Sequence, residues 1–325
     1  MTVLESLLDA GVQFDAEYAG GLSNHLPMAL VALHALGAPD ARLRAYATGY
    51  RARLSAAAPP GDWPAGEPWQ GRFGDPSAYP AYRSLFAQWL VHEPAQAVLP
   101  QVLPALLRGC GAAAFHGLIR TAYAVEAGHT GELVDGLAYW ACRHLALPTG
   151  APIEAAEDEP HAVLQGLWRA LAGWRSGERL VVQRMRDAAR QPAFAPHAAR
   201  LRIGSATRER LTREALRLYA HSGNFTVLHL VTACDALRRL LPFVDDHAAV
   251  LRDFWSAYAA GAASVGALAA QPGLPGLADW QSLAADAVAS DDEHVIKLVH
   301  SCRELDRLYG WDECRQAAAR ALAAV

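Results

Sequence analysis

The sequence predicts an all-α protein that forms one large multi-helical domain, arranged as an irregular helical array or a bundle. Three observations favour this fold class. Helix start and stop signals recur from one end of the chain to the other, apolar residues repeat with a helical period, and convincing alternating strand patterns are not found. With 52% hydrophobic and 19% charged residues, the chain can bury a large core, and no Ser/Gly-rich linker divides residues 1–325 into two domains.

Two helices are expected near the beginning of the chain. Ser23 and Asn24 can cap the first, which has a stop signal at Gly37. Asp40 can begin the second, which extends to Leu54. Both segments carry apolar side chains at helical spacing, so each is expected to pack one face into the core.

The segment from Pro59 to Pro80 interrupts the helices with many Pro, Gly and aromatic residues, so it predicts a long loop. Loops of this length in compact domains are usually functional. We therefore expect the loop to cover the entrance of an apolar pocket and to contact an aromatic substrate through its own aromatic side chains, namely Trp63, Trp69, Phe73 or Tyr79. A packed flap with no role in access is the alternative.

Helical periodicity resumes after this loop and predicts twelve further helices. An acidic, proline-containing break separates the fourth of them from the fifth. The alanine-rich character of several helices favours close packing. The segments are residues 81–92, 95–108, 112–127, 131–146, 161–176, 178–190, 207–221, 224–241, 246–269, 277–289, 291–309 and 312–323.

Charge and cysteine content exclude several classes of protein. The net charge of −4 comes from interspersed acids and arginines, without a basic stretch that could follow nucleic-acid phosphates. No basic leader precedes an apolar run, and no run approaches eighteen apolar residues, so we expect neither secretion by a signal peptide nor a membrane span but a cytoplasmic protein. The five cysteines contain no Cys-x-x-Cys pair, which favours reduced structural thiols.

Lys297 is the only lysine among 29 lysine and arginine residues. A coding bias towards arginine explains the other positions but not this one. A lysine can lose its proton, act as a nucleophile or become carbamylated, and an arginine does none of these readily. The residue is therefore a candidate for function, with a surface lysine on an amphipathic helix as the alternative.

Four of the thirteen histidines lie in apolar surroundings on four separate predicted helices: His25, His116, His229 and His294. An unpaired imidazole is costly to bury, so each must have a partner. Singly, each is more often a hydrogen-bonded core residue than a ligand, as expected for His34. Together, the four could converge on one metal ion.

The clearest local arrangement is in the segment from Ser290 to His300. Ser290 and Glu293 have the spacing of a capping box, which predicts a helix start that places His294 in the first turn. His294 and Lys297 are then i,i+3 neighbours on one face. His300 follows three residues later, and we expect it to be exposed or outside the ligand set.

Four segments together resemble the questin oxidase-like family: residues 24–38, 115–126, 224–238 and 292–302. Fungal members of this family carry out Baeyer–Villiger-type oxygenation and ring opening of anthraquinones and related polyketides. The resemblance implies an all-helical fold and a non-haem iron centre held by histidines and a carboxylated lysine. The matching positions in this chain are His25, His116, His229 and His294, with Lys297 as the lysine.

The implied activity is that of an oxygenase for an aromatic or quinone-like small molecule. Arg120 and Tyr123 lie on the helical face of His116 and are candidates for catalysis, by orienting an acidic substrate, although Arg120 could instead pair with a surface acid. No Gly-rich dinucleotide fingerprint is present, so NADPH would have to bind in another way or electrons would come from a partner.

Two other function classes remain open from the sequence. A metal-dependent hydrolase would use the same ligands to activate water, and zinc or a dinuclear site would favour it. A metal-free scaffold or binding protein would be favoured if the four histidines pointed apart. Neutral imidazoles suit Fe(II), Mn(II), Ni(II) and Zn(II), so the ligand types do not choose among these ions.

Overall fold

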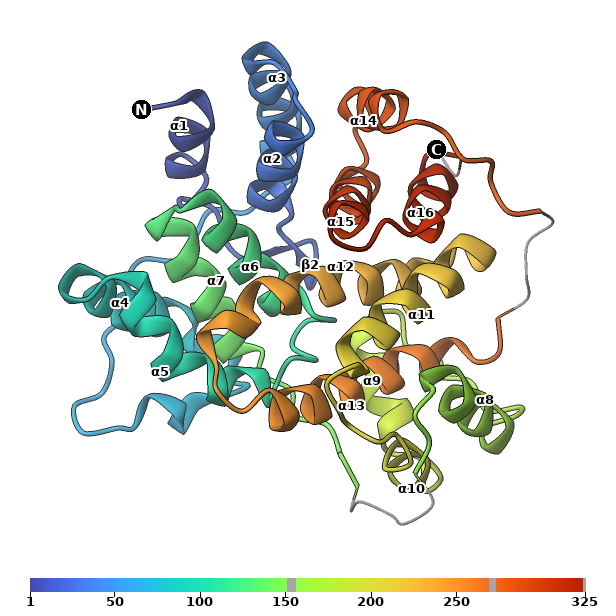
Figure 1. Ribbon diagram of the computed structural model, residues 1–325. Helices are drawn as coiled ribbons and strands as arrows, with labels where there is room; N and C mark the ends of the chain where they lie inside the picture. Colours follow the sequence, from blue (N-terminus) through green and yellow to red (C-terminus); the bar gives the residue numbers. More distant parts are fainter. Residues whose placement is uncertain (151–155, 269–272, 324–325) are drawn as a thin grey trace.

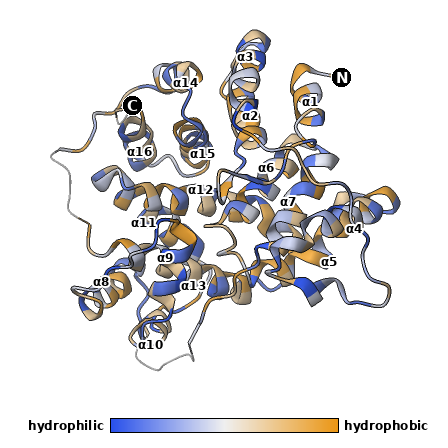
Figure 2. Ribbon diagram, turned by 180° about the vertical axis from the view of Figure 1, so that it is seen from behind, coloured by the Kyte–Doolittle hydropathy of each residue, from blue (hydrophilic) through white to orange (hydrophobic). Residues whose placement is uncertain are grey.

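The structure, a computed structural model that describes residues 1–150, 156–268 and 273–323, confirms the all-α prediction. The described residues form sixteen α-helices, three short 3₁₀ helices and one two-stranded hairpin (Figure 1). Hydrophilic and hydrophobic residues alternate along most of the helices (Figure 2), as expected for amphipathic helices around a core. Among the described residues, no helix combines the length and apolarity that a membrane span requires.

The N-terminal segment contains two elements that were not predicted from the sequence. Helix α1 (Val3–Asp9) is closed by a capping box between Thr2 and Glu5. The hairpin of β1 (Glu17–Tyr18) and β2 (Leu22–Ser23) then turns through residues 19–21, all with positive φ. Because the hairpin ends at Ser23, it leads directly into the start of α2.

The predicted helices near the beginning of the chain are α2 (Leu26–Ala35) and α3 (Asp40–Arg51). The Asn24 side chain accepts a hydrogen bond from the Leu26 N–H, as expected of a residue at a helix start. His34 is exposed on α2. The expectation that it is a core histidine is therefore wrong.

The segment from Pro59 to Pro80 is less irregular than predicted. It contains the 3₁₀ helices η1 (Trp69–Arg72) and η2 (Pro76–Ala78), and α4 begins within it at Tyr79. The ring of Trp69 packs edge-on against Phe86 and Trp89, with ring centroids 5.9 and 6.0 Å apart. The aromatic side chains of this segment therefore hold it against the helix that follows.

The middle of the chain supplies the helices at the left, in the centre and at the lower right of Figure 1. Helix α12 contacts α6, α11, α13 and α15, and the short α10 was not predicted. The helices of this middle part of the chain are α4 (Tyr79–His92), α5 (Ala95–Leu107), α6 (His116–Ala127), α7 (Thr130–Cys142), α8 (Pro160–Ala170), α9 (Val181–Ala189), α10 (Phe194–Ala198), α11 (Thr207–Ser222), α12 (Phe225–Leu240), η3 (Leu241–Phe243) and α13 (His247–Val265). The predicted helix at 246–269 ends early, at Val265, and residue 269 lies outside the described residues, as does part of the acidic break.

The C-terminal helices are α14 (Trp280–Ala289), α15 (Glu293–Tyr309) and α16 (Asp312–Leu322), which lie together in Figure 1. The start of α15 differs from the prediction, because Asp292 is the cap and accepts hydrogen bonds from the N–H groups of His294 and Val295. The predicted cap, Ser290, instead accepts a bond from the Asp292 N–H. His294 still lies in the first turn, as predicted.

Buried hydrophobic side chains form a contiguous core to which helices from α1 to α16 contribute. All five cysteines are buried free thiols, in agreement with the prediction for them. The four histidines predicted as metal ligands lie where α2, α6, α12 and α15 meet. Helix α2 contacts α6 and α15, and α12 contacts the same two helices.

Candidate metal centre

The four helices α2, α6, α12 and α15 each carry one histidine close to the N-terminal end. His25 directly precedes α2, His116 is the first residue of α6, His294 is the second of α15 and His229 is the fifth of α12. Because these helices pack around one point, side chains far apart in the sequence meet there.

The structure brings all four predicted histidines together. The centroid of the His25 ring lies 4.6 Å from that of His116 and 4.5 Å from that of His294. His229 lies 5.0 Å from His116 and 5.4 Å from His294 by the same measure. The arrangement does not have the diverging histidines that would favour a metal-free scaffold.

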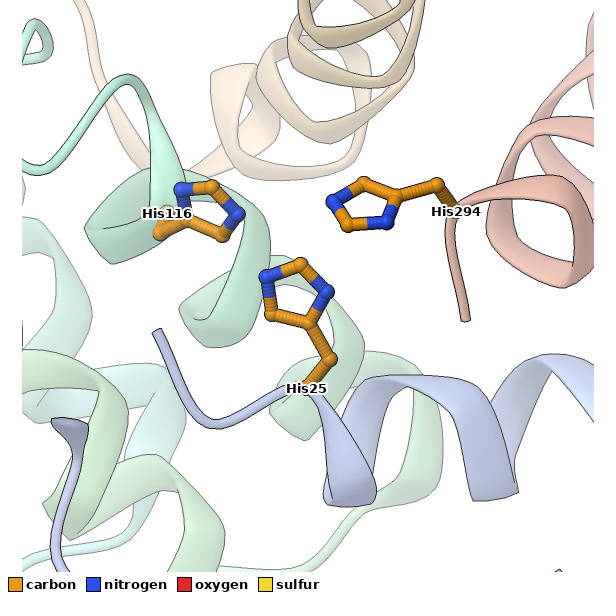
Figure 3. Close-up of side chains that lie close together, drawn as sticks. All are labelled: His25, His116 and His294. Carbon is orange, nitrogen blue, oxygen red and sulfur yellow. The ribbon is translucent and has the colours of Figure 1, made fainter. Parts of the chain in front are cut away.

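Three of these rings are placed to share one ion. His25, His116 and His294 each offer a ring nitrogen, and the three atoms lie within 4.8 Å of one another. Figure 3 shows the three rings turned towards a common point from three separate elements. His229 contacts two of these rings from the side but does not belong to the group of three.

In two of the imidazoles, a hydrogen bond determines which ring nitrogen carries the hydrogen atom. The Nδ1–H of His116 donates to the carbonyl oxygen of Ala113 at 2.5 Å, and that of His229 donates to the carbonyl oxygen of Phe225 at 2.8 Å. A carbonyl oxygen can only accept, so in each neutral ring the lone pair is on Nε2. Metal-binding histidines commonly donate their second ring N–H to a carbonyl or carboxylate in this way.

The Nε2 atom of His116 is buried and has no hydrogen-bond partner among the described residues. Buried polar atoms without partners are rare, because leaving one unpaired costs about 1–3 kcal/mol. The atom lies at the group of three nitrogens in Figure 3. A cation at this point would provide the missing partner, so the residues present fit a bound metal.

Burial keeps the four imidazoles neutral. It lowers the pKa of His25, His116 and His229 well below the usual value, and nearby Lys297 and the other histidines lower it further. The pKa of His294 is also lowered by burial, although the carboxylate of Asp292 acts in the opposite direction. The neutral ring is the form that binds metal ions.

Lys297 is 1% exposed, so the alternative of a surface lysine is wrong. Its Nζ lies 3.2 Å from Nδ1 of His25. Burial lowers the pKa of the ammonium to about 8, while the charges of Glu293 and Asp292 act in the opposite direction. The only lysine of the chain therefore lies beside the histidine cluster and can lose its proton more readily than an exposed lysine.

Glu293 belongs to the same site and was not predicted as part of it. Its Oε1 lies 3.9 Å from Nδ1 of His25 and 4.0 Å from Nδ1 of His294, and its other oxygen accepts a hydrogen bond from Arg53. From the sequence, this glutamate was expected only to be the partner of Ser290 in a capping box. Its position next to His294 was the signal that could have identified it.

The chain reaches His116 through a strained backbone. Ala113, Ala114 and Phe115 have φ of 45°, 56° and 70°, a left-handed run that residues with a Cβ rarely adopt. The helix then begins at once, and a Cβ on Gly117 would lie 2.7 Å from Cα of Trp140 on α7. Strain of this kind is often found at functional sites, and here it fixes the position of His116.

Replacing Ala113 by glycine should raise the free energy of unfolding by about 0.5–1 kcal/mol. The left-handed conformation costs about 1–2 kcal/mol for alanine, and the greater freedom of glycine in the unfolded chain offsets only part of that gain. In α16, replacing Ala319 by glycine should lower the free energy of unfolding by about 1 kcal/mol, since alanine is the better helix former. Urea unfolding of both variants measures the difference, and equal losses would show that the run is not strained.

A cleft of about 690 Å³ opens onto the cluster, and the four histidines and Glu293 lie in its wall. The remaining wall comes from the β1–β2 hairpin, from Ala113 and Ala114, from Arg143, from Arg179 and the residues that follow it into α9, and from Phe225 at the start of α12. A space of this size accepts a small organic molecule. No residue of the segment from Pro59 to Pro80 lines it, so the structure favours a packed flap over the lid that we predicted.

Arg120 and Tyr123 lie outside the residues that line this cleft. Arg120 is buried in α6, with Nη2 2.9 Å from a carboxylate oxygen of Glu132 and 3.1 Å from one of Asp135. Both acids are buried on α7, so the arginine pairs neither with a surface acid nor with a molecule in the cleft. Its contacts fit the joining of two helices better than catalysis.

Tyr123 contacts His300 rather than the histidine cluster. Its hydroxyl lies 3.0 Å from Nδ1 of His300, and Nε2 of that ring lies 3.1 Å from Glu126. His300 is 1% exposed, so of the two expectations for it the exposed position is wrong, while its place outside the group of possible ligands agrees with the structure. The three side chains form a polar group behind Lys297, whose backbone carbonyl lies 3.5 Å from the Tyr123 hydroxyl.

Comparison with known proteins agrees with the resemblance noted in the sequence. A family model described as Questin oxidase-like matches residues 22–302 of the 325-residue chain. The match includes all four histidines and Lys297. No curated protein matches the chain.

Proposed function

This chain belongs to the questin oxidase-like family, and on that premise we propose that it is an oxygenase that acts on an aromatic or quinone-like small molecule at a non-haem metal centre. The family suggests an oxidoreductase with a small-molecule substrate. The observation that carries this proposal is the meeting of four imidazoles beside the only lysine of the chain, at the wall of a cleft.

His25, His116 and His294 would hold the metal, with His229 as the fourth imidazole. Neutral imidazoles suit first-row divalent ions, and an oxidation with dioxygen favours a redox-active one such as iron. When bound, iron supplies the electrons that make dioxygen reactive. The unpartnered Nε2 of His116 and the buried rings around it support this assignment.

Lys297 would complete the ligand set as a carbamate, formed when the lone pair of its free amine attacks the carbon of carbon dioxide and the nitrogen releases a proton to solvent. The product is in effect a carboxylate at the end of a long side chain, and its negative charge would partly balance that of the metal. The 1% exposure of the residue and its place beside His25 support this role. The carboxylate of Glu293 is the other anionic group close enough to contribute.

The remaining residues of the site would hold the substrate and limit access of water. The histidines lie at the wall of the cleft, so a ring bound there would be adjacent to the proposed metal ligands, of which His25, His116 and His229 are buried and His294 is half-buried. A Baeyer–Villiger-type reaction inserts one atom of dioxygen between a carbonyl carbon and a neighbouring carbon atom, and it releases the other oxygen atom as water. Two further electrons are then required, and we propose NADPH as a donor.

Oxygen-isotope labelling tests the oxygenase proposal. Protein loaded with Fe(II) should convert hydroxylated naphthoquinones or anthraquinones to products that carry ¹⁸O from ¹⁸O₂, with NADPH supplied. A metal-dependent hydrolase would take the label from H₂¹⁸O and would continue without dioxygen. Mass spectrometry of the product distinguishes these results, and label from water alone would contradict the proposal.

A further inference from the structure

One wall of the cleft is strongly basic. Arg179, Arg184 and Arg186 line it from α9 and from the residues just before this helix. Three cations on one wall make the local potential positive and favour an anionic ligand. Arginine is well suited to the task, because its planar group can donate two parallel hydrogen bonds to a carboxylate.

The acids of the cleft do not neutralise this wall. Glu17 pairs with Arg143, and Glu293 pairs with Arg53. In the described part of the chain, none of the three arginines at α9 has an acidic partner within ion-pair distance. Their charges are therefore available to a ligand.

Arg184 connects this wall to the histidine cluster. Its Nη2 donates a hydrogen bond to Oγ1 of Thr226 at 3.3 Å, and its Nη1 donates to the carbonyl oxygen of Arg179 at 3.1 Å. Thr226 lies in the first turn of α12, three residues before His229. The half-buried guanidinium is thus held at the end of α12 that carries one of the candidate metal ligands.

Phe225 provides an apolar surface between the arginines and the histidines. Its side chain is 51% exposed, which is unusual for a phenylalanine, and it lies in the wall of the cleft. The ring centroid lies 4.9 Å from that of His229 and 4.7 Å from that of His294. An aromatic ring packed on Phe225 would therefore lie beside the candidate ligands and within the basic part of the cleft.

We propose that the substrate is an anionic aromatic molecule, whose ring packs on Phe225 and whose carboxylate or ionised phenol is bound by Arg179, Arg184 and Arg186. This inference names the substrate class of the proposed oxygenase and rests on that function. Helix α9 begins at the cleft without a side-chain cap, so the partial positive charge of its N-terminus adds to that of the arginines.

Binding to the metal-free protein tests this inference without turnover. The probes are 1-hydroxy-2-naphthoate, which is an anion at neutral pH, and 1-naphthol, which has the same ring system and is neutral. Isothermal titration calorimetry should give at least about tenfold tighter binding of the naphthoate, as expected for charge-assisted hydrogen bonds. Equal affinities, or failure of the naphthoate to bind, would overturn the proposal.

Variants identify the residues responsible. Replacing Arg184 and Arg186 together by glutamine should weaken naphthoate binding by about tenfold or more and leave 1-naphthol unchanged. Arg190→Gln is the matched control, because this arginine lies just after α9, pairs with Asp187 and does not line the cleft. Phe225→Ala should weaken both probes equally. An unchanged affinity for the naphthoate in the double variant would also overturn the proposal.

Failure of the anion inference can be distinguished from failure of the oxygenase proposal. The arginine variants keep every candidate metal ligand, so their iron content should equal that of the unmodified protein. If the chain were a hydrolase, the preference for the anionic probe would persist while the ¹⁸O label came from water. If the anion inference alone failed, iron binding and incorporation from ¹⁸O₂ would persist without the preference for the naphthoate.

Discussion

Replacing Lys297 by arginine should abolish both the metal binding and the oxygenase activity that we propose. Lys297 is fully enclosed beside His25, and a guanidinium stays charged where the lysine amine can lose its proton. It cannot form a carbamate, and its charge would repel the ion. We also expect the free energy of unfolding to fall by about 3–5 kcal/mol, because a permanent charge would be buried without a complete set of partners.

Two further variants separate the loss of a ligand from the loss of the fold. Lys297→Met keeps the length of the side chain without its charge, so the protein should stay folded and still fail to retain metal. In Lys297→Ala, added acetate or formate should restore part of the activity by supplying a carboxylate. Metal analysis, urea unfolding and oxygen uptake measure these effects. Full metal content and full turnover in Lys297→Arg would show that the role proposed for this lysine is wrong.

Replacing His116 by alanine should weaken metal binding by more than about 100-fold, because even changes outside the ligand set cost 10–100-fold in affinity. The variant removes the ring whose Nε2 lacks any other partner among the described residues. Oxygenase activity should fall with the metal content. The apoprotein should lose little more stability than expected for one buried ring, since among the described residues that ring makes a single hydrogen bond, to Ala113.

His34→Ala provides the control for that experiment. His34 lies on α2, the helix that follows His25, but it is exposed and belongs to no group of possible ligands among the residues that the structure describes. Its removal should leave metal affinity within twofold of that of the unmodified protein. Competition with a chromophoric chelator measures both variants. If His116→Ala bound metal as tightly as His34→Ala, His116 would not be a ligand.

The helical fold could be predicted because residues typical of helix starts and ends mark the bounds of most helices in the sequence. Asn224 caps α12, Gly310 ends α15 in the left-handed conformation, and the apolar period between such signals is clear. The β1–β2 hairpin could not be predicted, since strands of two residues have no period. Ser290 and Asp292 are both good caps, and only the packed structure decides between them.

The histidine cluster could be predicted because a buried imidazole needs a partner and four such residues shared apolar surroundings. The position of Arg120 could not, because its two partners lie on α7 and no local pattern connects them to α6. The three arginines of the basic wall could not be identified from the sequence either, since arginine occurs throughout this chain. The role of the loop after Pro59 as a lid was predicted wrongly, because an aromatic side chain such as Trp69 can be buried against α4 as well as against a ligand.

Elemental analysis of protein purified without oxygen or chelators tests the central claim most directly. The claim is that His25, His116, His229 and His294 hold one redox-active metal ion beside Lys297. We expect close to one iron, or another redox-active divalent ion, for each chain, and its loss on dialysis against a chelator should not unfold the helices. Folded protein that contains no transition metal and binds none when Fe(II) is added would contradict the account.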